Sequence, residues 1–164
     1  MRANSPIRLI IIMLLTAGSL AVNAQDRKHK SPVTNVIADK TLVKTDDGVE
    51  LQDGNCTVFE IKIDNGGDQR VDARMVTTLF FEIPSDQSSF EYTEKDFESK
   101  SAYILISECR CMDRGYNLVT KGYIRGSKLK NGNWKIESDV VAMGKDSQQE
   151  RSFSFSDTIP ASTK

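Results

Sequence analysis

Apolar residues fall on every second position over most of the chain beyond Val33. Such alternation predicts β-strands with one buried face, whereas an amphipathic helix needs apolar residues every three or four positions. In the longest example, every odd position from Val71 to Ile83 carries an apolar residue or threonine. The pattern therefore predicts an all-β protein.

Runs of Gly, Asn and Asp separate the alternating segments, and each run predicts a turn because these residues tolerate positive φ angles. The runs are 46–48, 53–55, 64–68 and 131–133, and a polar stretch at 144–150 precedes a last strand. We therefore expect hairpins at these positions.

The faces of the later strands follow from the same alternation. Tyr116, Leu118 and Ile124 are expected on one face of a strand, followed by a strand with Trp134 and Ile136 on its buried face. The segment 102–106 is apolar on both faces, which predicts a central strand covered on two sides.

About eight short strands predict a single antiparallel β domain over 33–160, either a sandwich or a barrel. The long polar connection 85–100 favours one short helix, since Thr93 and Asp96 have the spacing of a helix cap. Residues 161–164 are expected to be a loose C-terminus.

The N-terminus has the order of a secretion signal. Arg2 and Arg8 precede the apolar run 9–15, and small residues lead to Ala24. We expect a signal peptide over 1–24, cleavage between Ala24 and Gln25, and a secreted or periplasmic protein. Because the run is shorter than the roughly 20 residues that span a bilayer, no transmembrane anchor is expected.

Charge narrows the choice of partners. The predicted signal holds two of the 22 Lys and Arg residues and none of the 23 Asp and Glu residues, so the remainder carries 20 minus 23, or −3. The basic cluster Arg27, Lys28 and Lys30 lies in a tail, 25–32, that we expect to be flexible. A dispersed, mildly acidic surface argues against nucleic-acid binding.

Catalytic chemistry has few candidates. The single histidine, His29, lies in the basic tail, which argues against a catalytic triad or a zinc site in the domain. Two acids across a groove would suit a hydrolase, and the candidates are Glu60, Glu82, Glu91 and Glu108. No cofactor is expected.

Three cysteines give an odd count for an exported protein. On a strand, Cys109 and Cys111 would have Cα atoms about 6.5 Å apart, so we expect Cys56 to pair with one of them. Alternatives are three buried, reduced thiols, or thiol exchange or Cu(I) binding at Cys109, Cys111 and Met112.

Three aromatic residues are candidates for contact with a ligand: Phe80, Tyr92 and Tyr123. The sequence favours an exported, non-catalytic β domain with a binding or structural role at the cell envelope. Its expected partner is a protein, a glycan or a small apolar ligand. Alternatives are a small-ligand carrier with a barrel cavity, a two-carboxylate hydrolase, and a cysteine-based redox or Cu(I)-binding protein.

Overall fold

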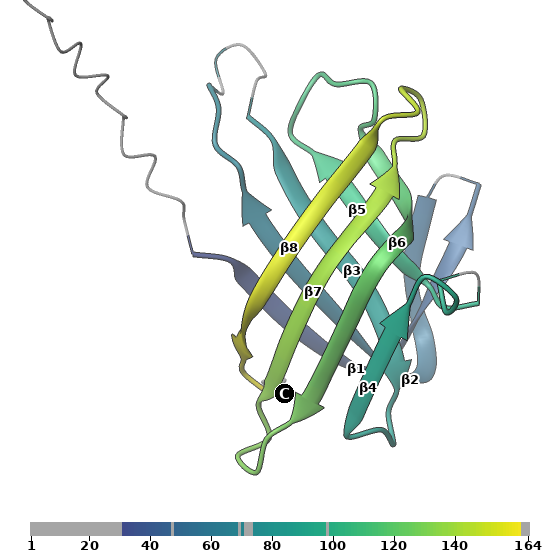
Figure 1. Cartoon of the computed structure of the whole chain (residues 1–164), viewed down its shortest axis with the longest axis vertical. Coiled ribbons are helices and arrows are strands. Elements are labelled where there is room, and N and C mark those ends of the chain that lie inside the picture. The colour runs from purple at the N-terminus through teal and green to yellow at the C-terminus, as the bar shows by residue number, and fades with distance from the viewer. Residues whose placement is uncertain (1–30, 47, 69, 71–73, 98, 162–164) are drawn as a thin grey trace, which may run out of the picture.

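The computed structural model describes residues 31–161, except 47, 69, 71–73 and 98. These residues form one curled antiparallel sheet, a half-barrel, which confirms the predicted all-β fold (Figure 1). Its strands are β1 (Val33–Thr45), β2 (Gly48–Asp64), β3 (Val76–Pro84), β4 (Ser89–Thr93), β5 (Ala102–Ser107), β6 (Gly115–Lys128), β7 (Trp134–Met143) and β8 (Glu150–Ile159). The predicted signal peptide, residues 25–30 of the predicted tail and residues 162–164 lie outside the described residues.

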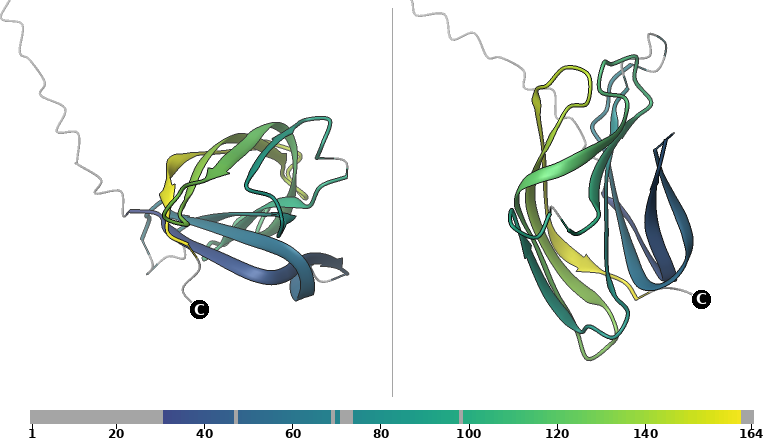
Figure 2. Two further views of the ribbon diagram at one scale, coloured as in Figure 1. Left: turned by 90° about the horizontal axis from the view of Figure 1, so that it is seen from below. Right: turned by 90° about the vertical axis from the view of Figure 1, so that its right-hand side faces the viewer.

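The sheet has the strand order β1-β2-β3-β5-β6-β7-β8. Strand β6 is long enough to change neighbours along one edge, because Gly115–Leu118 pairs with β5 and Tyr123–Ser127 pairs with β4. Its other edge pairs with β7. As Figure 2 shows, β6 thereby carries the sheet around a bend and gives it a concave and a convex face.

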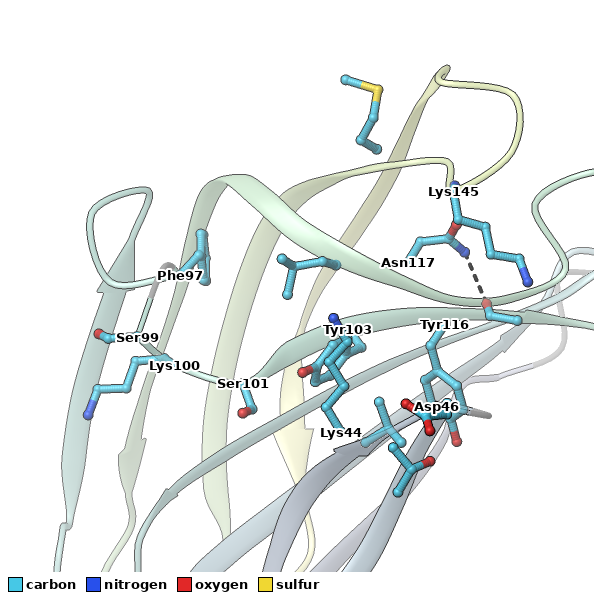
Figure 3. A pocket seen from close by; sticks show the side chains of 16 residues that line it. Lys44, Asp46, Phe97, Ser99, Lys100, Ser101, Tyr103, Tyr116, Asn117 and Lys145 are labelled. Atoms are coloured by element: carbon cyan, nitrogen blue, oxygen red, sulfur yellow. Dashed lines mark hydrogen bonds between the residues drawn. The ribbon is translucent and has the colours of Figure 1, made fainter.

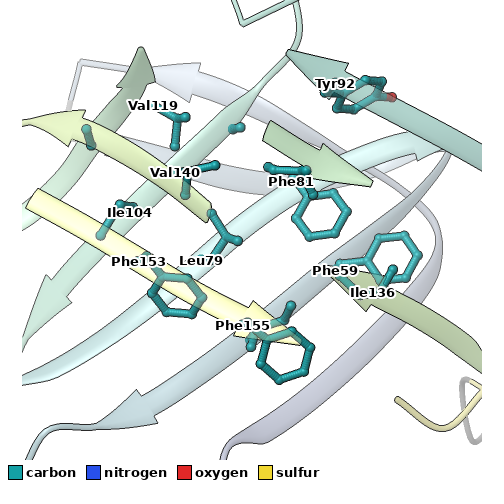
Figure 4. Packing of buried hydrophobic residues seen from close by; sticks show 14 of the residues in the cluster. Phe59, Leu79, Phe81, Tyr92, Ile104, Val119, Ile136, Val140, Phe153 and Phe155 are labelled. Atoms are coloured by element: carbon teal, nitrogen blue, oxygen red, sulfur yellow. The ribbon is translucent and has the colours of Figure 1, made fainter. Parts of the chain in front are cut away.

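The main core fills the concave face (Figure 4). The rings of Phe59 and Phe81 stack with centroids 4.8 Å apart, and Trp134 meets Phe59 edge-on at 5.3 Å. Ile61, Leu79, Ile104, Ile136, Val140, Phe153 and Phe155 are among the side chains that complete it. Burying each such side chain contributes about 1.5 to 3 kcal/mol, and the predicted alternation on β2, β3, β7 and β8 is confirmed where these residues occur.

A second core lies on the convex face. Leu42, Val58, Phe80 and Tyr103 form it, with Tyr116 packed at its side. Leu42 comes from the far part of the β1–β2 hairpin, residues 40–53, which we call the distal hairpin. Figure 2 shows the distal hairpin folded back beside the sheet.

A break in strand pairing causes this fold-back. Ala38 pairs with Thr57 and Lys40 with Asp53, so Asp39 alone stands opposite the three residues 54–56. Asp39 has a φ of 56°, and such an unequal count bends a hairpin sharply. The turn predicted at 53–55 is wrong, since β2 runs through these residues and bends there.

The central position predicted for 102–106 is confirmed, because β5 lies between β3 and β6. Ile104 and Ile106 face the main core, and Tyr103 faces the second core. Because both faces of β5 are covered, side chains on either face are shielded from water, which explains its continuous apolar sequence.

The face predicted for Tyr116 and Leu118 is wrong. Strand β6 shifts register between Val119 and Lys121, so Asn117 and Val119 point inward before the shift and Ile124 points inward after it. An extra residue in one strand exchanges its two faces. Leu118 is consequently 46% exposed, and Tyr116 lies on the convex side.

The short helix expected in 85–100 is wrong as well. The described residues there form β4 and a turn in which Thr93 donates hydrogen bonds to Asp96 Oδ2 from its backbone N at 2.8 Å and its Oγ1 at 2.9 Å. The spacing that resembled a helix cap closes this turn instead. No described helix is long and apolar enough to cross a membrane.

Candidate functional site: a groove beside the distal hairpin

A groove of about 580 Å³ opens between the turn of the distal hairpin, the β4–β5 connection and the start of β6 (Figure 3). Its described lining includes Lys44, Thr45, Asp46, Phe97, Lys100, Tyr103, Tyr116, Asn117, Leu118, Met143 and Lys145. The lining thus joins segments that lie far apart in the sequence, and the bend in the hairpin and the register shift in β6 bring them together.

Two tyrosines form the floor of this groove. The rings of Tyr103 and Tyr116 meet edge-on with centroids 6.3 Å apart. Tyr116 lies so close to the backbone of Gly48 that a Cβ atom there would come within 2.9 Å of the ring. Burial, followed by the negative charge of Glu60, raises the pKa of Tyr116, so its hydroxyl is neutral at physiological pH. The floor is therefore aromatic, with the two rings nearly perpendicular to each other.

Charged side chains surround the floor. Lys44, Lys100 and Lys145 contribute three ammonium groups, against the one carboxylate of Asp46 among the described lining residues. The Lys100 ammonium lies over the Tyr92 ring, 5.7 Å from its centroid, and the Lys145 ammonium lies 4.0 Å from a carboxylate oxygen of Asp146. Figure 3 shows Lys145 at the Asn117 end of the groove. The buried hydroxyl of Thr45 has no hydrogen-bond partner. The described part of the groove therefore combines an apolar floor with a positive rim.

Asn117 holds one end of the groove in place. Its Nδ2 donates to the backbone oxygens of Asp113 and Gly115, both at 3.0 Å, and to that of Ile104 at 3.2 Å. Its Oδ1 accepts a hydrogen bond from the backbone N of Lys145 at 2.9 Å. Asn117 thereby fixes the backbone that carries the Lys145 ammonium group.

A buried carboxylate joins the same two loops. Asp113 is fully buried and accepts hydrogen bonds from Ser147 Oγ at 2.6 Å, Ser147 N at 2.8 Å and Arg151 Nε at 2.8 Å. The Ser147 hydroxyl and backbone N–H, with Arg151, hold its pKa well below the usual range. Asp113, Asn117, Ser147 and Arg151, the Asp113 cluster, thus tie the β5–β6 loop to the β7–β8 loop.

The aromatic residues predicted to contact a ligand lie in three different places. Phe80 is buried behind Tyr116, with ring centroids 5.9 Å apart, so it supports the groove floor. Tyr92 is buried in the main core, donates to Glu82 O at 3.1 Å, and has a pKa raised by burial to about 12. Tyr123 donates to Glu137 Oε1 at 2.8 Å. The structure does not bring the three together, and their contact with a ligand stays a prediction.

The expected pairing of Cys56 is wrong. Cys109 and Cys111 form a disulfide, and Cys56 is a free, half-buried thiol. The two bonded cysteines lie in the β5–β6 loop and not on a strand, so their Cα atoms are 5.3 Å apart, within bonding range. Met112 follows them and is 67% exposed.

Three of the four candidate catalytic acids are engaged in separate contacts. Glu60 accepts from Asn35 Nδ2 at 2.7 Å, Glu82 from the distal hairpin, and Glu108 forms an ion pair with Arg74 at 2.8 Å. Glu91 is exposed on β4. Within the described part of the chain, no three His, Cys, Asp or Glu side chains gather in a way that could hold a metal ion.

Sequence reasoning missed the groove because its residues are ordinary ones in separate segments. The apolar run 102–106 signalled a second covered face, but nothing near Lys44 or Lys145 indicated that they lie at one site. Fold and site together define an all-β half-barrel with a lateral groove. Comparisons of the chain with protein-family models, curated proteins and solved structures gave no match.

Proposed function

We propose that this protein is an exported, non-catalytic binding protein whose groove holds a small organic anion with a flat apolar part. The observation that carries the proposal is the pairing of the Tyr103–Tyr116 floor with the ammonium groups of Lys44 and Lys145. A tyrosine ring offers a large apolar surface, and an ammonium group attracts a carboxylate or sulfonate.

The size and composition of the groove support a small ligand. Its volume of about 580 Å³ lies in the range of about 300 to 1,000 Å³ that is usual for small-molecule sites. Such sites join mainly apolar walls to a few polar groups that orient the ligand. Leu118 and Phe97 add apolar wall.

The contacts of the acidic residues favour binding over catalysis. A two-carboxylate hydrolase needs one acid on each side of its substrate. Glu82 and Glu108 are instead bound to the distal hairpin and to Arg74, respectively. The signal-like N-terminus supports export, and export predicts that the mature protein begins at Gln25, as mass spectrometry would show.

A matched pair of fluorescent probes tests the binding site. Anilinonaphthalene sulfonate carries an anionic group on an aromatic frame, and phenylnaphthylamine has the same frame without the charge. We expect the purified protein to bind the sulfonate more tightly. Lys44→Ser and Lys145→Ser should each weaken sulfonate binding about fivefold, the loss of about 1 kcal/mol typical of an exposed charge pair.

Lys130→Ser is the control, since Lys130 is an exposed lysine in the β6–β7 turn outside the groove. It should leave the affinity for both probes unchanged. Tyr116→Ala should weaken both probes alike, because it removes the shared apolar contact. Equal affinity for the two probes, or equal effects of all three lysine substitutions, would contradict the proposal.

A further inference from the structure

The disulfide between Cys109 and Cys111 bridges a single residue, Arg110. A disulfide stabilises a fold mainly by restricting the unfolded chain, and the restriction grows with the length of the loop that it closes. A bridge across one residue therefore restricts the unfolded chain very little. Stabilisation is a poor account of why two sulfurs are joined here.

The loop that carries the disulfide is anchored by other contacts. On its N-terminal side, Glu108 forms an ion pair with Arg74 at 2.8 Å. On its C-terminal side, Asp113 is held by Ser147 and Arg151. Because both flanks are fixed without the sulfur atoms, the loop can keep its position when the disulfide opens.

The two sulfurs differ in access. Cys109 is 7% exposed, whereas Cys111 is half-buried and lies between the exposed residues Arg110 and Met112. An attacking thiolate would therefore reach Cys111 first.

We propose that the Cys109–Cys111 disulfide is exchangeable and oxidises pairs of thiols in a protein substrate. A substrate thiolate attacks Cys111 Sγ, the S–S bond breaks, and its electron pair leaves on Cys109 Sγ, which takes a proton from water. A second substrate thiolate then attacks the mixed disulfide, and Cys111 leaves and is protonated. Two substrate thiols become one disulfide, and Cys109 and Cys111 become two thiols.

This activity is independent of ligand binding in the groove, and its test uses the full exported chain with Cys56→Ser. That substitution removes the third thiol and leaves the disulfide. The oxidised protein is mixed with reduced, unfolded ribonuclease A as the thiol substrate, and thiols are trapped with iodoacetamide at timed intervals. We expect substrate thiols to disappear in the same number as new thiols appear at Cys109 and Cys111.

A second measurement identifies the attacked sulfur. With glutathione as a single-thiol attacker, we expect the trapped mixed disulfide at Cys111. Cys111→Ser should abolish oxidation of ribonuclease A. A disulfide that remains intact with excess reduced substrate, or an oxidised protein that lacks the Cys109–Cys111 bond, would overturn the proposal, as would a mixed disulfide found mainly at Cys109.

Discussion

The backbone N of Leu42 donates a hydrogen bond to Glu82 Oε2 at 2.6 Å, and this contact joins the distal hairpin to the central strand β3. The same oxygen accepts from Thr41 Oγ1 at 2.8 Å. One carboxylate thus satisfies two donors at the point where the hairpin bends. The second core beneath it depends on that attachment.

Replacing Glu82 should therefore loosen the distal hairpin. We expect Glu82→Ala to lower the free energy of unfolding by about 1.5 to 3 kcal/mol, as for a hydrogen bond to a charged group. Urea unfolding measures this loss. Glu91→Ala, at an exposed position of β4, should change stability by less than about 0.5 kcal/mol, and equal losses would refute the role of Glu82.

Next to the register shift in β6, position 122 accepts only glycine. Its φ is 95°, and a Cβ atom there would lie 2.0 Å from the backbone oxygen of Asp139. We expect Gly122→Ala to cost more than about 3 kcal/mol or to prevent folding, as circular dichroism and urea unfolding would show. Gly66→Ala is the control, because Gly66 has a φ of 74° but open space around it, and about 1 kcal/mol is expected.

The Asp113 cluster should make stability depend on acidity. The pKa of Asp113 is lower in the folded protein than its ordinary value of 3.8, so the unfolded chain binds the proton first. The stabilisation is present above about pH 4 and declines as the pH falls below that value. Asp113→Asn should melt at least about 5 °C lower at neutral pH and lose less stability on acidification.

Urea midpoints at about pH 6 and pH 3 compare the wild type with Asp113→Asn. Asp53→Asn is the control, since the pKa of Asp53 is also lowered, by its hydrogen bond to Lys40, but its side chain is exposed. Asp53→Asn should change the acid sensitivity of the free energy of unfolding less than Asp113→Asn does. If the wild type and Asp113→Asn lost the same stability between about pH 6 and pH 3, Asp113 would not be the origin of the acid sensitivity.

The cysteine assignments predict a simple thiol count. Unfolded, unreduced protein should show one reactive thiol, Cys56, and none after Cys56→Ser. Removal of the short bridge by Cys109→Ala with Cys111→Ala should cost only about 1.5 kcal/mol, the value for a three-residue loop in the chain-entropy model. Phe81→Ala, in the main core, should cost about 3 to 5 kcal/mol. A larger loss in the double variant than in Phe81→Ala would contradict this ranking.

Alternation predicted the strands because burial of one face repeats every two residues wherever a strand stays regular. Trp134 and Ile136 illustrate this, as both lie in the main core as expected. The prediction failed at Tyr116 and Leu118, where one extra residue in β6 exchanged the faces. Thr120 has no feature that marks a bulge, because the partner strand decides where the register shifts.

The groove could not be predicted for a related reason. Lys44 and Tyr103 line the same groove because the hairpin bends opposite Asp39, and that bend depends on unequal pairing between two strands. The Gly54-Asn55 pair did signal a change of direction, but a turn and a bend have the same local composition. The position of the groove therefore depends on strand pairing between distant segments, which the local sequence pattern does not reveal.

The two cores differ in how they can open. The hydrogen-bonded sheet from β2 to β8 encloses the concave face, whereas the convex face is covered by the distal hairpin, which the hydrogen bond between Leu42 and Glu82 holds in place. Amide hydrogen exchange should therefore be faster in the distal hairpin than in β3. When the distal hairpin moves away from the sheet, Phe80 and Tyr103 become exposed to water and the groove widens. Phe81 and Ile104, their immediate neighbours in the chain, remain buried in the main core.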